Sequence, residues 1–281
     1  MRDQLFSSNK ETPDDKIKIM QDKHILHIPI LDNNGSVIGL DSIHDLLKRP
    51  ILDNPVVIMA GGFGKRLMPL TEDTPKPLLK IGTKPILETI INNFTDLGFR
   101  NFYISLHYKA DMIKDYFGNG SDHNVSINYL EEKEPMGTAG CLSLLPENLS
   151  DLPIILMNGD LMTDLNFVSL LENHNESGSE ATICVAEYDF QVPYGVLEVE
   201  ENEVKSIAEK PIHKFFVNAG IYVLNKSILS NIEKDKFTDM PDVLSKKIST
   251  NKSINTFPIF EKWIDIGRIS DFKKANEQFE E

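Results

Sequence analysis

Three glycines and two adjacent cations directly follow one apolar run of the chain. The run Pro55–Ala60 is short, apolar and partly β-branched, which predicts a strand buried on both faces of a parallel sheet. Glycines let the backbone approach a polyanion and turn its N–H groups toward it, and cations add positive charge. Because ligands bind outside the carboxyl ends of such strands, the segment predicts a loop that binds phosphate. The residues expected to line it are Ala60, Gly61, Gly62, Gly64, Lys65, Arg66 and, further along, Lys76.

Two common phosphate-binding loops do not fit this segment. A dinucleotide-binding fingerprint starting at Gly62 requires a third glycine where Leu67 stands. A Walker loop ending in Gly64-Lys65 requires a glycine at Met59 and a serine or threonine at Arg66. A dehydrogenase and a P-loop nucleotidase are therefore disfavoured.

The segment Gly61-Gly-Phe-Gly-Lys-Arg-Leu-Met-Pro-Leu-Thr71, followed by Pro75-Lys-Pro77, resembles the signature of the sugar-1-phosphate nucleotidyltransferases. Its usual form is Gly-Gly-x-Gly-Thr-Arg-Leu-x-Pro-Leu-Thr and then Pro-Lys-Pro, so this chain departs once, with Lys65 for threonine. The resemblance extends over residues 55 to about 275. It implies that the phosphate of a sugar 1-phosphate attacks the α-phosphorus of a nucleoside triphosphate in line and that pyrophosphate leaves. It further implies that Arg66 holds the triphosphate and Lys76 the transferred phosphate.

Two aspartates match the metal ligands of the family. Asp160 follows the apolar strand-like run Pro153–Asn158, which predicts a carboxylate at the same edge of the sheet as the glycine loop. Mg²⁺ prefers carboxylate and phosphate oxygens, and it typically uses one or two protein carboxylates. The resemblance implies that Asp160 and Asp265 bind Mg²⁺. Alternatively, Asp160 forms a turn after Asn158-Gly159, and Asp265 is an ordinary residue at a helix N-terminus.

Three later segments resemble the sugar-contacting parts of the family. In Glu209-Lys210-Pro211, the resemblance implies that Lys210 contacts the attacking phosphate and Glu209 a sugar hydroxyl. The other two segments contribute Tyr194, Gly195 and Asn218. An aromatic ring beside a glycine suits a sugar face. Ordinary packing of Tyr194 and a solvated strand end at Glu209-Lys210 are the alternatives.

The segment Glu131–Gly140 resembles the base-recognition segment of the family, in which a glutamine or glutamate precedes a glycine by five residues. That residue is Glu132 here, and Gly137 and Thr138 follow it. A carboxylate only accepts hydrogen bonds, so it can receive both N1–H and the amine of guanine, whereas uracil and thymine present carbonyl oxygens. This favours GTP. A preference for UTP or dTTP, with a merely solvated acidic loop here, is the alternative.

From residue 55 onward, strand-like and helix-like segments alternate, which predicts an α/β fold with a Rossmann-like, mostly parallel sheet flanked by helices. Apolar residues with a period of 3.6 predict a helix from Pro85 to Leu97, ended by Gly98. From Ala181 the pattern changes to shorter alternating strands. The further segments expected are strands at 101–106, 125–130, 153–158, 182–186, 195–199 and 216–223 and helices at 110–117 and 138–145.

Residues 1–50 predict a separate module ahead of a nucleotidyltransferase domain at 51–281. Helices at 16–23 and 42–47 and strands at 27–31 and 36–40 are expected, with a hairpin turn at Asp32–Gly35. Arg49-Pro50 and Asp53-Asn-Pro55 predict a linker. The module resembles the later part of a CBS domain, a regulatory unit that normally works as a tandem pair. Such a fragment cannot easily bury its own sheet, so it is expected to pack on the main domain, to pair with another chain in a homo-oligomer, or to be the remnant of a longer protein.

Composition narrows the class of partner. Asp and Glu number 43 against 29 Lys and Arg, and the net charge of −14 argues against nucleic acid or an anionic membrane as the main partner. No stretch approaches the ~18 apolar residues of a membrane span. The two cysteines, Cys141 and Cys184, are too few for a disulfide scaffold. A cytoplasmic protein is predicted. The histidines, serines and cysteines form no nucleophile–base motif, which suits chemistry without a covalent intermediate.

A second class of function remains open from the sequence. Lys65 in place of threonine is compatible with a catalytically inactive transferase fold that senses nucleotide sugars, with residues 1–50 as its regulatory part. Such a protein would bind a nucleotide sugar and turn over no nucleoside triphosphate. The sequence does not choose among glucose, mannose, glucosamine and heptose 1-phosphates.

Overall fold

The computed structural model describes residues 7–8, 13–31, 35–47, 51–250 and 253–279. The chain divides into two compact units, Met1–Ile51 and Leu52–Glu281. The sequence placed this boundary one residue earlier. The predicted turn at Asp32–Gly35 and the linker residues Arg49-Pro50 fall wholly or largely outside the described residues.

The first unit is a small sheet with two helices. Strand β1 (Ser7–Ser8) runs parallel to β2 (His27–Leu31), which pairs antiparallel with β3 (Val37–Ser42). Helices α1 (Pro13–Asp22) and α2 (Ile43–Leu47) complete it. Met20 of α1 and Ile28 of β2 are fully buried, so the unit has a small core of its own. That it is part of a CBS domain stays a prediction.

The second unit is built on a seven-stranded sheet with the order β15-β11-β14-β9-β4-β7-β8. All pairs are parallel except the two that β14 makes, which are antiparallel. The predicted mostly parallel α/β fold is confirmed. The strands of this sheet are β4 (Leu52–Met59), β7 (Phe99–Leu106), β8 (Ser126–Glu131), β9 (Ile154–Asn158), β11 (Ala181–Gln191), β14 (Ile212–Leu224) and β15 (Ile254–Ile259).

Helices and short strands surround the sheet. The helices are α3 (Ile86–Asp96), α4 (Ala110–Phe117), α5 (Gly137–Gly140), α6 (Phe167–Ser177), α7 (Met240–Ser249) and α8 (Ile269–Phe279), with 3-10 turns η1 (Lys65–Leu67), η2 (Lys76–Leu78), η3 (Ser121–His123), η4 (Cys141–Leu144) and η5 (Lys226–Asn231). The remaining strands are β5 (Lys80–Ile81), β6 (Lys84–Pro85), β10 (Leu161–Thr163), β12 (Gly195–Glu200), β13 (Glu203–Glu209) and β16 (Trp263–Asp265).

Alternate side chains of β4 enter two different cores. Val56 and Ile58 pack with residues of α3, α4, α6 and α8 on one face of the sheet. Val57, on the opposite face, packs with residues of α5 and α7. Successive side chains of a strand point to opposite faces, so a continuous apolar run is what a sheet covered on both sides requires. This burial fixes the carboxyl ends of β4 and β9, where the candidate site lies.

The predicted linker at Asp53–Pro55 was wrong. These residues belong to β4, and the Asn54 side chain is buried and donates a hydrogen bond to the Pro153 carbonyl at 2.9 Å. The pairing of β4 with β7 is irregular between Leu52 and Pro55. Since proline lacks an N–H donor, a proline and an asparagine here mark an irregular strand start rather than a connection between domains.

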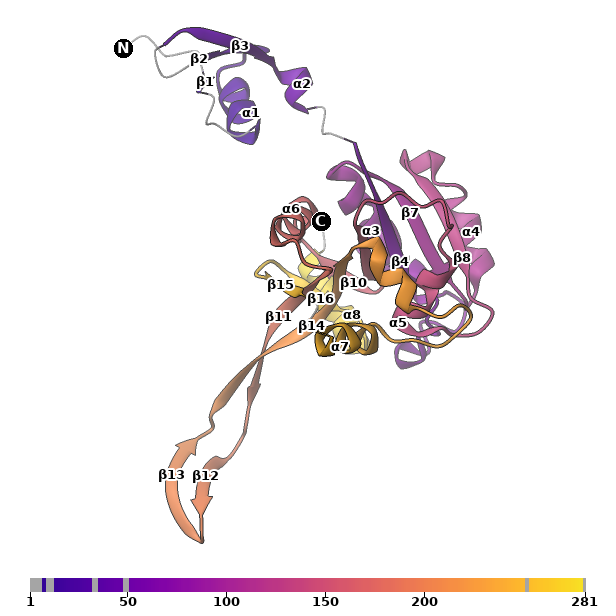
Figure 1. Ribbon diagram of the computed structural model, residues 1–281, viewed down its shortest axis with the longest axis vertical. Coiled ribbons are helices and arrows are strands. Elements are labelled where there is room, and N and C mark those ends of the chain that lie inside the picture. Colours follow the sequence, from indigo (N-terminus) through magenta and orange to yellow (C-terminus); the bar gives the residue numbers. More distant parts are fainter. Residues whose placement is uncertain (1–6, 9–12, 32–34, 48–50, 251–252, 280–281) are drawn as a thin grey trace. The chain divides into compact units, whose positions relative to one another are not determined.

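A two-stranded ribbon leaves the sheet at β11 and β14 and ends in the hairpin β12–β13 (Figure 1). We call residues 187–216 of this ribbon the arm. Every residue of the arm is exposed except Val192 and Pro211, which are half-buried. Since β11 runs parallel to β9 and β4, the arm rises from the edge where those strands have their carboxyl ends. The arm therefore begins at the same edge of the sheet as the glycine loop.

Candidate functional site

The glycine loop turns tightly over the end of β4. Gly64 has φ of +64°, and a Cβ there would lie 2.8 Å from Cγ2 of Thr71. The Thr71 hydroxyl in turn donates to the Gly64 carbonyl at 2.9 Å. A Cβ on Gly61 would lie 3.2 Å from the backbone nitrogen of His107, whereas one on Gly62 would meet nothing within 4 Å. Close packing thus excludes a side chain at Gly64 and leaves little room for one at Gly61, whereas Gly62 faces open space.

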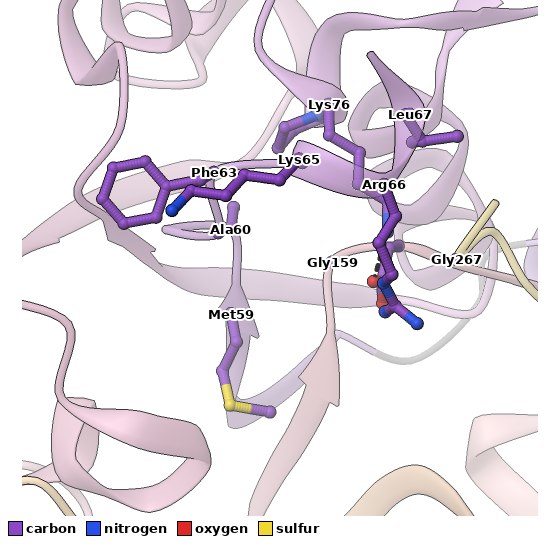
Figure 2. Close-up of a pocket in the computed structure, with 13 residues that line it drawn as sticks. Met59, Ala60, Phe63, Lys65, Arg66, Leu67, Lys76, Gly159 and Gly267 are labelled. Atoms are coloured by element: carbon purple, nitrogen blue, oxygen red, sulfur yellow. Dashed lines mark hydrogen bonds and ion pairs between the residues drawn. The ribbon is translucent and has the colours of Figure 1, made fainter. Parts of the chain in front are cut away.

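The loop closes one side of a cavity of about 300 Å³. Figure 2 shows that the neighbouring side chains of Lys65 and Arg66 point in different directions within it. The Lys65 ammonium group lies 5.2 Å from the centre of the Phe63 ring. The Arg66 guanidinium lies beside Gly267, where a Cβ would be 3.4 Å from Nη1. Arg66 is exposed, so its charge is available to an anion in the cavity.

Lys76 reaches the same cavity from η2. It is only 9% exposed, and its ammonium group forms an ion pair with the Asp160 carboxylate at 2.5 Å. Asp160 follows Gly159, whose backbone nitrogen donates to the Met59 carbonyl at 2.8 Å. The carboxyl ends of β9 and β4 are thereby held together. The structure brings Lys76, Asp160 and the glycine loop into one cavity, as the sequence predicts for a phosphate site.

Asp265 lies next to Asp160 although the two are far apart in the sequence. In the antiparallel pair β10–β16, Leu161 is opposite Asp265, and the Ile266 nitrogen donates to the Asp160 carbonyl at 3.0 Å. Burial raises the pKa of the Asp265 carboxyl, and the Asp160 carboxylate raises it further, while Lys76 and Arg66 lower it. Two carboxylates that repel each other at the edge of an anion-binding cavity are an arrangement that a divalent cation would stabilise.

This donor set fits Mg²⁺. In the structure the Lys76 ammonium group already lies against Asp160, so the carboxylate is positioned to face a cation. The described residues contain no cluster of three or more His, Cys, Asp or Glu side chains that could hold a metal. Mg²⁺ commonly keeps several waters and shares one or two carboxylates with substrate phosphates, so two aspartates are sufficient donors. Binding of Mg²⁺ by Asp160 and Asp265 stays a prediction.

A second cavity, of about 300 Å³, adjoins the glycine loop on the side of β8. Glu132 lies in its wall, as do Gly137 and Thr138, which the sequence assigned to the nucleotide. One oxygen of the Glu132 carboxylate accepts a hydrogen bond from the Ser105 hydroxyl, and the other accepts from the Met136 nitrogen at 2.9 Å. These bonds fix the orientation of the carboxylate and leave its remaining lone pairs for a ligand.

Gly137 and Thr138 hold this wall in place. Gly137 has φ of +77°, and a Cβ there would lie 2.6 Å from the Thr238 carbonyl oxygen. The backbone nitrogen and the hydroxyl of Thr138 both donate to Asp239, at 3.0 and 3.1 Å. The hydroxyl also accepts from the Met240 nitrogen at 2.8 Å. Thr138 therefore joins α5 to the start of α7.

A third cavity, of about 410 Å³, is lined by Asp265, which lines neither of the other two, and we call it the polar pocket. Asn218, at the base of the arm, lies in its wall and donates to the Tyr222 hydroxyl at 2.6 Å. The pocket is rich in polar and acidic side chains. It is lined by Thr138, Asn158, Leu161, Asn218, Ala219, Gly220, Tyr222, Asp239, Pro241, Asp242, Trp263 and Asp265.

The structure places the other predicted sugar-contacting residues elsewhere. Tyr194, Gly195, Glu209 and Lys210 lie together on the arm, and none of them lines the three cavities. Gly195 pairs with Glu209, and the Lys210 nitrogen donates to the Tyr194 carbonyl at 3.2 Å. Tyr194 is 74% exposed. These four residues form one group, as the resemblance implies, but the group is separate from the cavities.

Sequence reasoning missed Asp239 and Asp242 of the polar pocket. The sequence contains a local pattern here, because Asp239 directly precedes α7 and proline is the second residue of that helix. Aspartate followed by proline in this way is typical of a helix start. That pattern predicts a helix terminus and not a ligand site. It also missed Gly267, whose missing side chain makes room for Arg66.

Comparisons with known proteins identify the family of the chain. The family described as nucleotidyl transferase matches residues 55–281. A mannose-1-phosphate guanyltransferase from Aspergillus fumigatus is 34% identical over an alignment of 227 residues, and the match covers 77% of this chain. The chain spans only about 61% of the length of that relative. The matches to solved structures cover more of the relative's own length.

The crystal structure of HddC from Yersinia pseudotuberculosis has 32% sequence identity to this chain and a TM-score of 0.64. The match covers 81% of this chain and all of that one. A second structure of HddC, complexed with GMP-PN, has 29% identity and a TM-score of 0.62. The relatives thus include one named as a guanyltransferase and one whose structure holds a guanine nucleotide analogue.

Proposed function

Since the chain belongs to the nucleotidyl transferase family, specifically the sugar-1-phosphate nucleotidyltransferases, we propose that it transfers a guanylyl group from GTP to a sugar 1-phosphate. The products are a GDP-sugar and pyrophosphate. The observation that supports this most strongly is that Arg66, Lys76 and Asp160 line one cavity beneath the glycine loop, with Asp265 paired beside Asp160. The names of the curated relatives make mannose 1-phosphate the first acceptor to test.

Both reactants are anions, so the main task of the residues is to neutralise charge and to align the phosphates. The loop amides and Arg66 hold the triphosphate, and Lys76 holds the α-phosphate. Asp160 and Asp265 would hold Mg²⁺, which supplies positive charge to the phosphates when it is bound. Because the described site offers no nucleophile–base pair, the attacking oxygen is that of the sugar 1-phosphate itself. A direct in-line displacement follows from this set of residues.

The proposal is tested by measuring pyrophosphate release with four nucleoside triphosphates and a panel of mannose, glucose, glucosamine and heptose 1-phosphates. We expect turnover with GTP and Mg²⁺. Asp160→Asn should lower the rate by about a hundredfold or more, as loss of one charge-stabilising group typically does. Asp164→Asn, which changes an exposed carboxylate four residues further on, is the matched control. No pyrophosphate from any pair, or equal rates for parent and Asp160→Asn, would contradict the assignment.

Base selection is assigned to Glu132. Replacing it by glutamine puts an amide donor where guanine needs acceptors, while it leaves one oxygen for Ser105 or the Met136 nitrogen. Glu132→Gln should therefore reduce kcat/KM for GTP relative to UTP and dTTP by about tenfold, the value of one hydrogen bond to a charged group. Glu134→Gln, in the same acidic segment but exposed, should keep the parent ranking of nucleotides. An unchanged ranking in Glu132→Gln would remove the guanine assignment.

A further inference from the structure

Lys65 is the position at which the glycine loop departs from the signature of its family, where the usual residue is threonine. It follows Gly64 directly and begins the 3-10 turn η1. Its side chain is exposed and lines the cavity beneath the loop, which we call the phosphate cavity. Figure 2 shows that Lys65 points toward Phe63, whereas Arg66 points toward Gly267. A flexible cation therefore stands in this cavity where a threonine would offer a short hydroxyl.

The contact that holds the Lys65 ammonium group is a weak one. In the described part of the chain it makes no hydrogen bond or ion pair, and it lies 5.2 Å from the centre of the Phe63 ring. A cation–π contact at an exposed site favours the bound state by only about two- to fivefold. A charge-assisted hydrogen bond to a phosphate oxygen favours it by about ten- to hundredfold. The ammonium group would therefore leave the ring for a phosphate within its reach.

The Phe63 ring that supports this lysine is itself held in place. Its centre lies 5.3 Å from that of the His107 ring, edge to face, and 5.5 Å from that of Tyr108. His107 in turn donates through Nδ1 to the Glu132 carbonyl at 2.9 Å. Phe63 lines both the phosphate cavity and the cavity of Glu132. The ring thus keeps Lys65 over the nucleotide cavities, so less side-chain freedom is lost when the lysine binds a ligand.

Lys65 also decides the balance of charge around the phosphate cavity. Lys76 pairs with Asp160 at 2.5 Å, and Arg66 is close enough to Asp265 to lower the pKa of its carboxyl. These two cations and two carboxylates cancel in charge. Lys65 lines the same cavity and leaves it with a net positive charge before any metal binds. In a chain with a net charge of −14, an anion gains most from cations at contact distance, because distant charges are screened.

We propose that Lys65 binds the β- and γ-phosphates of the nucleoside triphosphate, the part that leaves as pyrophosphate. Lys76 and Asp160 are assigned to the α-phosphate, and Lys65 forms no bond with either, so the two outer phosphates are the ones left for it. The inference deepens the function proposed above and rests on it for the identity of the ligand.

The charge of Lys65 acts where negative charge grows during the reaction. An oxygen of the acceptor phosphate forms a bond to the α-phosphorus, while the bond from that phosphorus to the bridging oxygen breaks. The electron pair of the broken bond stays on pyrophosphate, and the Lys65 ammonium group stabilises it there. No proton has to move in this step.

A cation fixed to the chain also makes triphosphate binding less dependent on metal. Mg²⁺ supplies positive charge to phosphates when it is bound, through carboxylate and phosphate oxygens. Lys65 supplies its charge from the loop whether or not the aspartates hold an ion. The departure from threonine is thus a gain of charge for the donor site and not the loss of an essential group.

Calorimetric titration with inorganic tripolyphosphate in EDTA tests this contact without turnover. The parent should bind, and Lys65→Thr, which restores the usual residue of the family, should bind at least about tenfold more weakly. Lys65→Arg keeps the charge and should stay within about threefold of the parent. Lys80→Thr changes an exposed lysine that lines none of the three cavities, and it should bind like the parent. GMP, which lacks the outer phosphates, should bind equally to the parent and to Lys65→Thr in the same buffer.

Two results would overturn the proposal. One is a parent that does not bind tripolyphosphate without metal. The other is a Lys65→Thr variant that binds it as tightly as the parent does, and a lower melting temperature with unchanged binding would mean that the lysine serves only to hold Phe63. Since Lys65 is exposed, we expect the melting temperatures of Lys65→Thr and the parent to be equal.

Kinetics separates this inference from the proposed function. In the active enzyme, Lys65→Thr should raise KM for GTP, and KM for pyrophosphate in the reverse reaction, by about tenfold or more. It should also raise the Mg²⁺ concentration needed for half the maximal rate, and leave KM for the sugar 1-phosphate unchanged. If the parent turns over no pair of substrates, the proposed function fails and the binding titrations decide the role of Lys65 alone. If the parent is active and Lys65→Thr has the same KM values, the role of Lys65 fails and the function stands.

Discussion

Gly64 is the residue of the glycine loop that has the least room for a side chain. Its φ of +64° and the closeness of Thr71 both exclude a side chain. Gly64→Ala should therefore lower the free energy of unfolding by about 1–2 kcal/mol, the cost of a left-handed conformation for a residue with a Cβ, and more if Thr71 cannot move. Thermal unfolding followed by circular dichroism measures this.

Gly62→Ala is the matched control for Gly64→Ala, since a Cβ at Gly62 would meet nothing within 4 Å. Its melting temperature should equal that of the parent. Its KM for GTP should rise nevertheless, because Gly62 lines the cavity and its missing side chain leaves room for the phosphates. Equal melting temperatures for both variants would contradict the steric role of Gly64.

The residue types of the sequence predicted which charged side chains meet in the cavity beneath the glycine loop. They did not predict all the residues of the neighbouring pockets. Glycine, lysine and aspartate at strand ends predicted the grouping of the loop, Lys76 and Asp160, because carboxyl ends of parallel strands share an edge. Asp239 and Asp242 were missed because they line a pocket only through the position of α7, which a local pattern does not contain. The hydrogen bonds of Glu132 were likewise invisible, since Ser105 comes from a different strand.

Helix α6 is held to the sheet by a buried histidine. His174 is 1% exposed, its Nδ1 lies 2.9 Å from the Thr182 hydroxyl of β11, and its Nε2 lies 3.2 Å from Oδ1 of Asn225. Asn225 donates through its amide nitrogen to the Ser179 carbonyl, so its oxygen is the acceptor for Nε2–H. Burial lowers the pKa of His174 below its ordinary value of 6.5. The folded protein therefore keeps this ring neutral.

The unfolded chain takes up a proton on His174 as the pH falls below 6.5, while the folded chain does not until lower pH. The contribution of the neutral His174 ring to the free energy of unfolding is thus fully present above pH 6.5. It is lost as the pH falls toward the pKa that His174 has in the folded protein. The melting temperature of the parent should fall more steeply than that of His174→Gln between about pH 7.5 and about pH 5.5. His213→Gln, at an exposed position, should follow the parent. Parallel curves for parent and His174→Gln would contradict this role.

Elements with a clear period were predicted closely, whereas of the arm only β12 was predicted, at 195–199, and its protrusion from the sheet was not. Helix α4 was predicted with its observed bounds, and α3 within a residue or two, because their apolar residues recur on one face. In β11, polar Glu187 and Asp189 alternate with apolar Tyr188 and Phe190, which is the pattern of a strand with one buried face. Alternation does not reveal whether anything covers that face, and here both faces are exposed.

At the scale of the whole molecule, net charge opposes association of two copies. Each chain carries −14, so a dimer joins two strongly negative bodies. Salt screens such long-range repulsion between exposed charges. The dissociation constant of any self-association should therefore decrease by several-fold when NaCl rises from about 50 mM to about 300 mM, as the Debye length shortens toward 6 Å.

Sedimentation equilibrium at several salt concentrations measures this trend. A dimer that weakens with salt would mean that contacts between opposite charges outweigh the net repulsion.

The sequence also predicted the cellular location and the absence of a membrane span. None of the helices in the described part of the chain combines the length and apolar character needed to cross a bilayer. The cytoplasmic location and the CBS-like character of residues 1–50 stay predictions.

Strand β14 runs opposite to its neighbours, so the chain leaves the sheet at the end of β11 and re-enters it at the same edge, through a hairpin rather than through a crossover behind the sheet. Insertions or deletions in that hairpin can therefore change the exposed surface above this edge, while the buried strands of the sheet keep their register.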